Sequence, residues 1–384
     1  MQGLQGLLDM PAAGPPVEAP PAAPPAPPPA PPATASLSPA KAADVISAQV
    51  GARVAVRVQN PDSPEDLDDV GSDGGAMAVL SGQVHPFLKW QVGFLGTYGG
   101  EAAAAPTGNA VLLDLVAKIE LVDALNLWVG RMPIPSDRAN LSTEWAIAPW
   151  TLPGSYGFYV PSLLTGPRQG KNDRGDGLAL WGEVRGGKLK YYLGAFGLDR
   201  PKTMSPLYSA RLSLSLLDPE PGYRTSSGYY GTKRILSLGV GAQHRANGSR
   251  ASTGTPPAAS DFTVLGADLL LEIGNSTAGV LDLEGAFAKV WGDHETASYQ
   301  GFVLVSYLVP IEIGFGRFQP LVRLQRAGQG SAPGAGDLTS IDAQLGYVID
   351  GHHARLLVVY QCTELPGQTQ NALLFGAQLL SHAN

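Results

Sequence analysis

The chain has 384 residues, and charged residues make up only 15% of it, well below the roughly 25% that is usual for soluble domains. Mean hydropathy is +0.02 and no stretch approaches the roughly 20 consecutive apolar residues of a membrane-spanning helix. These values exclude a helical membrane protein and fit a membrane β-barrel, and the formal net charge of −7 argues against nucleic-acid binding, which needs a basic surface.

The first part of the chain, residues 1–44, is dominated by proline and alanine between residues 11 and 40, as in PPAAPPAPPPAPPATA. Such a run lacks backbone donors and cannot build a packed core. We expect a disordered, extended periplasmic tether, which acts as a spacer or binds a periplasmic or cell-wall partner. Residues 1–10 show neither the basic start nor the long apolar run of a secretory signal, so we expect the export signal to have been removed or to precede residue 1.

The second part, residues 45–384, alternates apolar and polar residues in short segments. In residues 111–121 the odd positions are all apolar, whereas Asp114, Lys118 and Glu120 occupy even positions. A strand places these two sets on opposite faces, and about 9–11 residues suffice to cross a bilayer as a tilted strand. A soluble β-sandwich is the alternative, but its strands average about 5–6 residues, which is shorter than the segments seen here.

About sixteen segments follow this pattern: 45–59, 75–84, 87–98, 110–121, 124–131, 176–184, 188–197, 207–216, 235–245, 261–273, 278–291, 299–309, 316–327, 338–349, 353–363 and 371–382. Tight connections alternate with longer ones, as in outer-membrane barrels with short periplasmic turns and long outer loops. The connection at 217–234 is longer than this alternation predicts. An even strand number would place both ends of the barrel on the periplasmic side.

Four stretches, in this order along the chain, resemble the phosphate-selective porin O/P family of outer-membrane porins. They are NAVLLDLVAKIELVDALNLWVGRMPIP (109–135), NDRGDGLALWGEVRGGKLKYYLGAFG (172–197), YQGFVLVSYLVP (299–310) and FGRFQPLVRLQRA (315–327). The resemblance covers roughly residues 45–382.

The resemblance implies an all-β, transmembrane antiparallel barrel of about 16 strands, usually a homotrimer in outer-membrane lipid, with a long third loop, here 132–175, folded into the lumen. Two features depart from the family. The chain ends in LLSHAN rather than in an aromatic residue, and Arg174-Gly175-Asp176 replaces the family's Arg-Asp. Phosphate selectivity in the family depends on a basic lumen, which this sequence does not plainly show.

Candidate residues that line or constrict the pore come from the water-facing strand positions and from the long loop. They are Lys118, Arg131, Arg138, Arg168, Lys171, Arg174, Arg323, Arg355, Asp114 and Glu120. A ring of cations in a pore would favour anions and a ring of acids would favour cations. The alternative for each strand charge is pairing with a neighbour on the lumen wall. Arg131 ends a strand on the lipid-facing parity, so it either bends inward at the rim or anchors the loop to an acid.

Catalysis is not indicated, and neither a cofactor nor a metal is expected. No histidine lies in a G-x-S-x-G or H-E-x-x-H motif, and the pairs around His294 and His352 have no further metal ligand close in sequence. We read the single cysteine, Cys362, as a small apolar residue and the Arg-Gly-Asp triplet as chance. The sequence therefore predicts a passive outer-membrane porin for small hydrophilic solutes or ions, including anions such as phosphate. The alternative is a barrel with a plugged lumen that serves as a structural or surface-binding platform through its proline tether.

Overall fold

The computed structural model describes the backbone of residues 46–60, 69–101, 107–143, 145–152, 174–197, 205–254, 257–275, 277–293, 295, 297–332 and 335–381. The expected tether, residues 1–44, lies outside the described residues.

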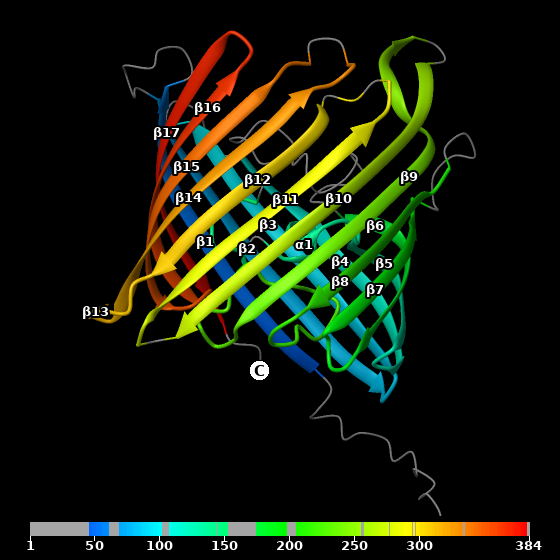
Figure 1. Ribbon diagram of the computed structural model, residues 1–384, viewed down its shortest axis with the longest axis horizontal. Helices are drawn as coiled ribbons and strands as arrows, with labels where there is room; N and C mark the ends of the chain where they lie inside the picture. Colours follow the sequence, from blue (N-terminus) through cyan, green and yellow to red (C-terminus); the bar gives the residue numbers. More distant parts are fainter. Residues whose placement is uncertain are drawn as a thin grey trace, which may run out of the picture. The chain divides into compact units, whose positions relative to one another are not determined.

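The described residues form one closed antiparallel barrel of sixteen long strands with a two-residue extra strand, β13 (Figure 1). The first and last strands pair with each other, so the sheet has no free edge and every wall strand has two neighbours. The strands are β1 (Ile46–Asn60), β2 (Asp69–His85), β3 (Leu88–Glu101), β4 (Thr107–Val122), β5 (Leu125–Pro133), β6 (Arg174–Val184), β7 (Leu189–Phe196), β8 (Leu207–Ser215), β9 (Ile235–Gly254), β10 (Pro257–Asn275), β11 (Gly279–Trp291), β12 (Ala297–Leu308), β13 (Glu312–Ile313), β14 (Gly316–Gln329), β15 (Leu338–Asp350), β16 (Ala354–Leu365) and β17 (Gln368–Leu380).

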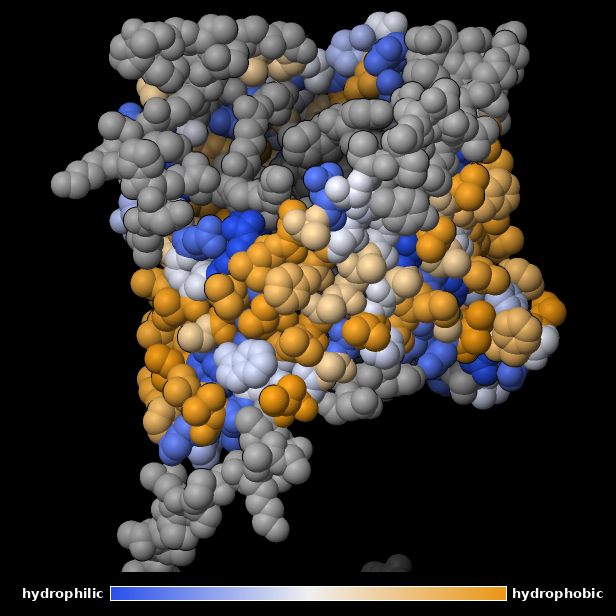
Figure 2. Space-filling model, turned by 180° about the vertical axis from the view of Figure 1, so that it is seen from behind, coloured by the Kyte–Doolittle hydropathy of each residue, from blue (hydrophilic) through white to orange (hydrophobic). Residues whose placement is uncertain are grey.

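Each of the sixteen predicted segments coincides with one long strand, so the predicted fold class is confirmed. The alternation also assigns the two faces correctly. On β15, Ile341 and Leu345 are exposed on the outer face, whereas Ser340, Asp342 and Gln344 are buried on the lumen side. Hydrophobic side chains gather in a belt on the outer face, as a barrel surrounded by lipid requires (Figure 2).

One strand departs from simple alternation. Between β3 and β4, Gly93 pairs with Asp114 but the next residue, Phe94, pairs with Leu112, so Leu113 is an extra residue in β4. This β-bulge turns Leu112 outward and leaves Leu113 buried. The prediction that Leu113 shares a face with Leu115 is therefore wrong, because the bulge changes the parity of the strand at that point.

The connections differ at the two ends of the barrel. At the terminal end, where β1 begins and β17 ends, most described connections are short turns, such as 123–124 and 351–353. Residues 216–234, between β8 and β9, are the long exception at this end, as their length in the sequence had suggested. No helix in the described ranges is long and apolar enough to cross a membrane.

Two connections from opposite ends occupy the lumen. The third-loop segment, residues 134–152, follows β5 and contains the short helix α1 (Arg138–Leu141), whose four residues are all buried inside the barrel (Figure 1). The β8–β9 segment, residues 216–234, enters from the terminal end and includes buried Tyr223 and Ser227. The predicted inward fold of the third loop is thus confirmed for its described residues.

Candidate functional site

The third-loop segment is fastened to the barrel wall by arginines that donate hydrogen bonds to its backbone carbonyls. At its far end, Arg323 on β14 donates to the Thr151 carbonyl over 2.7 Å and to the Thr151 hydroxyl over 2.8 Å. Arg355 on β16 donates to the Ile147 and Ala148 carbonyls over 2.7 and 2.9 Å. These two candidate residues therefore hold the loop in place and are themselves almost completely buried.

Two further arginines complete this set. Arg53 on β1 donates to the Trp150 carbonyl, and its guanidinium lies 3.9 Å from the centre of the Trp150 ring. Arg211 on β8 donates to the Ser136 carbonyl over 3.3 Å and forms a buried, bidentate pair with Asp268 on β10. The segment is consequently held from both sides of the barrel.

The start of the third-loop segment, which we call its root, contains Asp137, the N-cap of α1. Its carboxylate accepts a hydrogen bond from the Asn140 backbone N–H over 3.0 Å and another from the Ser136 hydroxyl over 2.9 Å. Burial, together with the nearby charge of Asp268, raises the pKa of Asp137 to about 7. This loop carboxyl therefore changes its charge near neutral pH, unlike an ordinary aspartate.

The third-loop and β8–β9 segments meet through a buried ion pair. The Arg138 guanidinium donates to both carboxylate oxygens of Glu220, over 2.8 and 2.5 Å, and both side chains are 1% exposed. Tyr229 donates a further hydrogen bond to Glu220 over 2.6 Å. Burial alone would raise the pKa of Glu220, but the Arg138 charge outweighs it and lowers this pKa to about 2, so the pair stays charged at neutral pH.

Backbone and hydroxyl contacts extend the same junction. Thr225 of the β8–β9 segment donates from its hydroxyl to the Arg138 carbonyl over 3.0 Å and from its backbone N–H to the Leu141 carbonyl over 3.2 Å. The Ser227 N–H donates to the Ala146 carbonyl over 2.9 Å. The two segments thus form one continuous hydrogen-bonded unit across the lumen.

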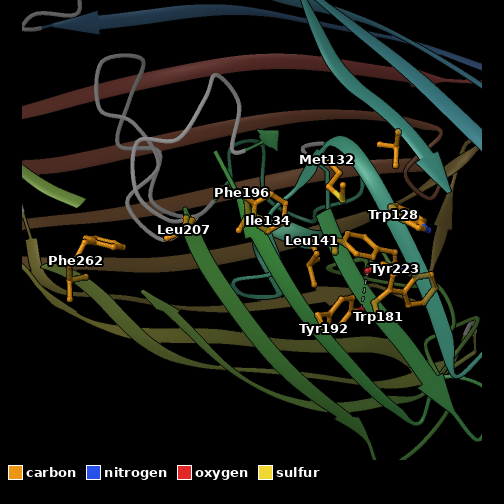
Figure 3. Close-up of a cluster of buried hydrophobic side chains, with 13 residues drawn as sticks. Trp128, Met132, Ile134, Leu141, Trp181, Tyr192, Phe196, Leu207, Tyr223 and Phe262 are labelled. Carbon is orange, nitrogen blue, oxygen red and sulfur yellow. Dashed lines mark hydrogen bonds between the residues drawn. The ribbon is translucent and has the colours of Figure 1, made fainter. Parts of the chain in front are cut away.

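An aromatic cluster packs the β8–β9 segment against the wall (Figure 3). Tyr223 stacks on Trp128 of β5 with ring centres 4.4 Å apart, and Trp181 of β6 contacts both rings edge to face. The hydroxyl of Tyr192 donates to the Tyr223 carbonyl over 3.0 Å, and the hydroxyl of Tyr223 donates to the Pro133 carbonyl over 2.8 Å. This cluster anchors the β8–β9 segment to the wall by apolar contacts.

Beside this cluster lies a cavity of about 550 Å³ toward the terminal end of the barrel. Charged and polar side chains from β3 to β6 form its wall, and residues 221–224 of the β8–β9 segment close one side. Its charged lining residues are Lys89, Lys118, Glu120, Asp123, Glu183 and Arg224. Positive and negative side chains are therefore equally represented.

Within this lining, Lys118 differs from the other cations. Lys89 forms an ion pair with Glu120 over 2.7 Å. The Lys118 ammonium donates to the Gln91 side chain over 2.8 Å and lies 4.2 Å from the centre of the Trp128 ring. Among the described side chains, no carboxylate lies within ion-pair distance of Lys118, whereas Lys89 and Arg224 of the same lining each pair with one.

Asp114 on β4 forms ion pairs with two arginines, one on β6 and one in the β8–β9 segment. It accepts from Arg174 at the start of β6 over 3.1 Å and from Arg224 of the β8–β9 segment over 2.6 Å. Gln91 donates to the same carboxylate over 3.0 Å. Asp114 is 1% exposed, so this candidate joins the wall to the β8–β9 segment beneath the surface of the lumen.

The structure places the ten sequence-selected candidates at different sites. Lys118 and Glu120 line the cavity, whereas Arg323 and Arg355 lie beneath the third-loop segment. Arg131 stays on the outer side near the end of β5 and pairs with Asp176 of β6 over 3.0 Å. It therefore anchors to an acid, which is one of the two roles considered for it. Asp114, Arg138 and Arg174 are buried in ion pairs, and Arg168 and Lys171 lie outside the described residues.

Several residues that hold the lumen segments in place were not among the candidates predicted from the sequence. Arg53 and Arg211 occupy the polar parity of β1 and β8, between outward residues such as Val54 and Leu212, so the alternation could have identified them. Glu220 and Arg224 lie in a connection with no periodic pattern, and no local signal indicated that they enter the lumen. Within the described ranges, no group of three or more His, Cys, Asp or Glu side chains could hold a metal ion.

No protein-family model matches the sequence, and no curated protein matches it. Solved structures do share its fold. Salmonella typhi OmpF in complex with daunomycin is 12% identical over 88% of this chain and 97% of that chain, with a TM-score of 0.57. Vibrio cholerae OmpT, an outer membrane protein in a trimer form, is 11% identical over 88% and 99% of the two chains, with a TM-score of 0.54. The likeness shows a porin-type barrel fold, and membership of the phosphate-selective family stays a prediction.

Proposed function

We propose that this protein is an outer-membrane channel for passive diffusion of small hydrophilic solutes or ions. One observation carries the proposal, namely a closed, polar-lined barrel whose third loop crosses the lumen and is fixed there by wall arginines such as Arg323 and Arg355. In the proposed channel, a loop held in this way narrows the path and limits the size of the solute. The proposal assigns no catalytic step to the barrel.

The charged lining of the cavity supports weak rather than strong ion selectivity. Its cations and acids balance, and most described lumen arginines already contact an acid or a loop carbonyl. More specifically, we propose that the channel prefers anions such as phosphate. Lys118 supports it, because no described carboxylate pairs with this ammonium. A homotrimer in outer-membrane lipid is part of the same proposal, in line with the trimer form of Vibrio cholerae OmpT.

Single-channel recording in a planar bilayer, with the reversal potential measured in a KCl gradient, tests the proposal. Discrete conductance steps from detergent-purified protein are the expected result, with a reversal potential near zero or slightly toward anions. Cation-selective steps would keep the channel and remove the phosphate preference. No steps from protein whose heat-modifiable gel migration shows a folded barrel would reject the channel.

A barrel with a plugged lumen, serving as a platform, is the second candidate. The junction between the third-loop and β8–β9 segments favours it, because these two segments from opposite ends fill part of the lumen together. In this case we expect almost no conductance, and we expect residues 1–40 fused to a carrier to capture a periplasmic or cell-wall partner.

A further inference from the structure

The β8–β9 segment enters the lumen from the terminal end, where the other described connections are mostly short turns. Its residues Glu220 and Ser227 are 1% exposed and lie against the third-loop segment and the wall. A chain that simply joined two adjacent strands could do so with a few residues. The extra length is thus used to bring this segment into contact with the loop that narrows the barrel.

Most contacts of the β8–β9 segment are polar. Wall carboxylates accept its backbone and hydroxyl groups, as Glu272 accepts the N–H groups of Tyr229 and Gly231 and Glu284 accepts the Ser227 hydroxyl. If the segment moved away, water could take over these hydrogen bonds, so its displacement costs far less than removal of an apolar core element. Tyr223, stacked on Trp128, and Tyr230, packed against Val280, Leu308 and Val348, are the apolar contacts to be broken.

The backbone at both ends of residues 223–230 and the space at the Gly222 end also permit movement. Gly222 and Gly231 have φ angles of +89° and +81°, which side-chain-bearing residues rarely adopt, and they bracket residues 223–230, which include Thr225 and Ser227 at the junction. Nothing lies within 4 Å of the position that a Cβ atom would take at Gly222. The cavity of about 550 Å³ is bounded by residues 221–224, so the segment has free volume directly beside it.

We propose that residues 223–230 of the β8–β9 segment are a gate of the channel. They are seated in this structure against the third-loop segment by Tyr223, by Thr225 and by the hydrogen bond from Arg138 to the Ser226 carbonyl, with the Arg138 guanidinium held in place by Glu220. The channel opens further when residues 223–230 swing toward the terminal end about Gly222 and Gly231, which separates Thr225 and Ser226 from Arg138 and Tyr223 from Trp128. This inference rests on the proposed channel function. It adds a second, movable constriction to the fixed one made by the third loop.

A reversible cross-link tests the gate. The Ser142 and Thr225 hydroxyl oxygens lie 3.2 Å apart across the junction, so the double variant Ser142→Cys/Thr225→Cys can form a disulfide between the two segments. Cys362→Ala removes the native thiol in the same background. With the disulfide formed, single-channel conductance should fall at least threefold relative to the same protein after reduction, and reduction should restore it.

A matched cross-link elsewhere in the lumen controls for oxidation. Ser340 and Thr363 are direct partners on β15 and β16 with hydroxyl oxygens 3.1 Å apart, and neither belongs to the junction. The Ser340→Cys/Thr363→Cys variant, also with Cys362→Ala, should conduct equally in both redox states. Heat-modifiable migration and thiol titration establish folding and disulfide formation for both variants.

A second variant tests the ion pair without a cross-link. Glu220→Gln removes the charge that holds Arg138, and we expect the fraction of time spent in the larger conductance state to rise at least tenfold. Equal conductance of the oxidised and reduced Ser142→Cys/Thr225→Cys protein, or an unchanged open fraction in Glu220→Gln, overturns the gate while leaving the channel intact. No conductance in any variant or redox state overturns the channel itself and the gate with it.

Discussion

Arg323 on β14 and Asp342 on β15 are direct partners in the antiparallel register, and the Arg323 Nε atom donates to the Asp342 carboxylate over 2.6 Å. The same guanidinium donates to both oxygens of Thr151 in the third-loop segment. One ion pair therefore joins two wall strands to the loop that crosses the lumen. Because both side chains are at most 3% exposed, removal of either leaves an uncompensated buried charge.

We predict that Arg323→Gln lowers the free energy of unfolding by about 3–5 kcal/mol, the usual effect of breaking a buried pair on one side. Urea unfolding in lipid vesicles, followed by tryptophan fluorescence, measures it. Arg326→Gln is the matched control on the same strand, since Arg326 and Asp337 are 3.7 Å apart and more than half exposed. Such a surface pair contributes about 0–1 kcal/mol, so equal unfolding midpoints for the two variants would contradict the prediction.

The strands and their faces could be predicted because both follow from a local pattern with a period of two. Ser340, Asp342 and Gln344 lie in the lumen as their parity indicated. The bulge at Leu113 could not be predicted in this way. It depends on how β3 and β4 align, and that alignment is a property of two strands rather than of either sequence alone.

The binding partners of the charged lumen side chains were less predictable than the strand face on which these side chains lie. Parity placed Arg355 in the lumen, but the carbonyl groups that it binds belong to Ile147 and Ala148, more than 200 positions away in the chain. Glu220 illustrates the same limit from the other side, because its partner Arg138 lies in a loop that enters from the opposite end. Periodicity specifies a face, whereas these pairings depend on the path of irregular loops through the barrel.

Lys118 is the residue whose charge should most affect ion selectivity, because no described carboxylate pairs with its ammonium in the cavity. A unit charge acts on an ion about 4 Å away with roughly 1 kcal/mol even in water, which corresponds to about a fivefold change in an equilibrium ratio. We therefore expect Lys118→Gln to lower the anion-to-cation permeability ratio by up to about fivefold, read from the reversal potential in a KCl gradient.

The control for this prediction is Lys188→Gln. Lys188 lies in an exposed turn at the same end of the barrel but does not line the cavity, so its neutralisation removes the same charge at a distance from the path. We expect its reversal potential to match that of the unmodified protein. Equal shifts in the two variants would mean that the cavity is not on the route of the ions.

Gly241 on β9 allows the third-loop segment to approach the wall. A Cβ atom at this position would lie 2.3 Å from the Ser136 carbonyl oxygen, a backbone atom that cannot turn away as a side chain can. Gly241→Ala should therefore displace the root of the loop and lower the free energy of unfolding by about 1–3 kcal/mol, as overpacking does elsewhere. Gly96→Ala is the control, because its nearest neighbour, the Ala76 carbonyl, would be 3.8 Å away. If both variants unfold at the same urea concentration, the loop does not depend on this contact.

Asp137 should make the stability of the protein depend on pH. Its pKa is raised from 3.8 to about 7 by burial and by the Asp268 charge, so between these values the folded protein binds a proton that the unfolded chain releases. The stabilisation is fully present below pH 4 and is lost as the pH rises through 7. Urea unfolding should therefore show lower stability at pH 8 than at pH 5.

Asp137→Asn keeps a neutral side chain that can still accept the Asn140 N–H, so we expect this variant to lose less stability between pH 5 and pH 8. Asp123→Asn, in an exposed turn, removes one carboxylate outside the third-loop segment and should keep the original pH dependence. Conductance recorded at the same two pH values shows whether the loop itself responds, because a loosened root should increase current noise at pH 8 in the unmodified protein but not in Asp137→Asn. The same pH dependence of unfolding in all three proteins would assign it to other groups.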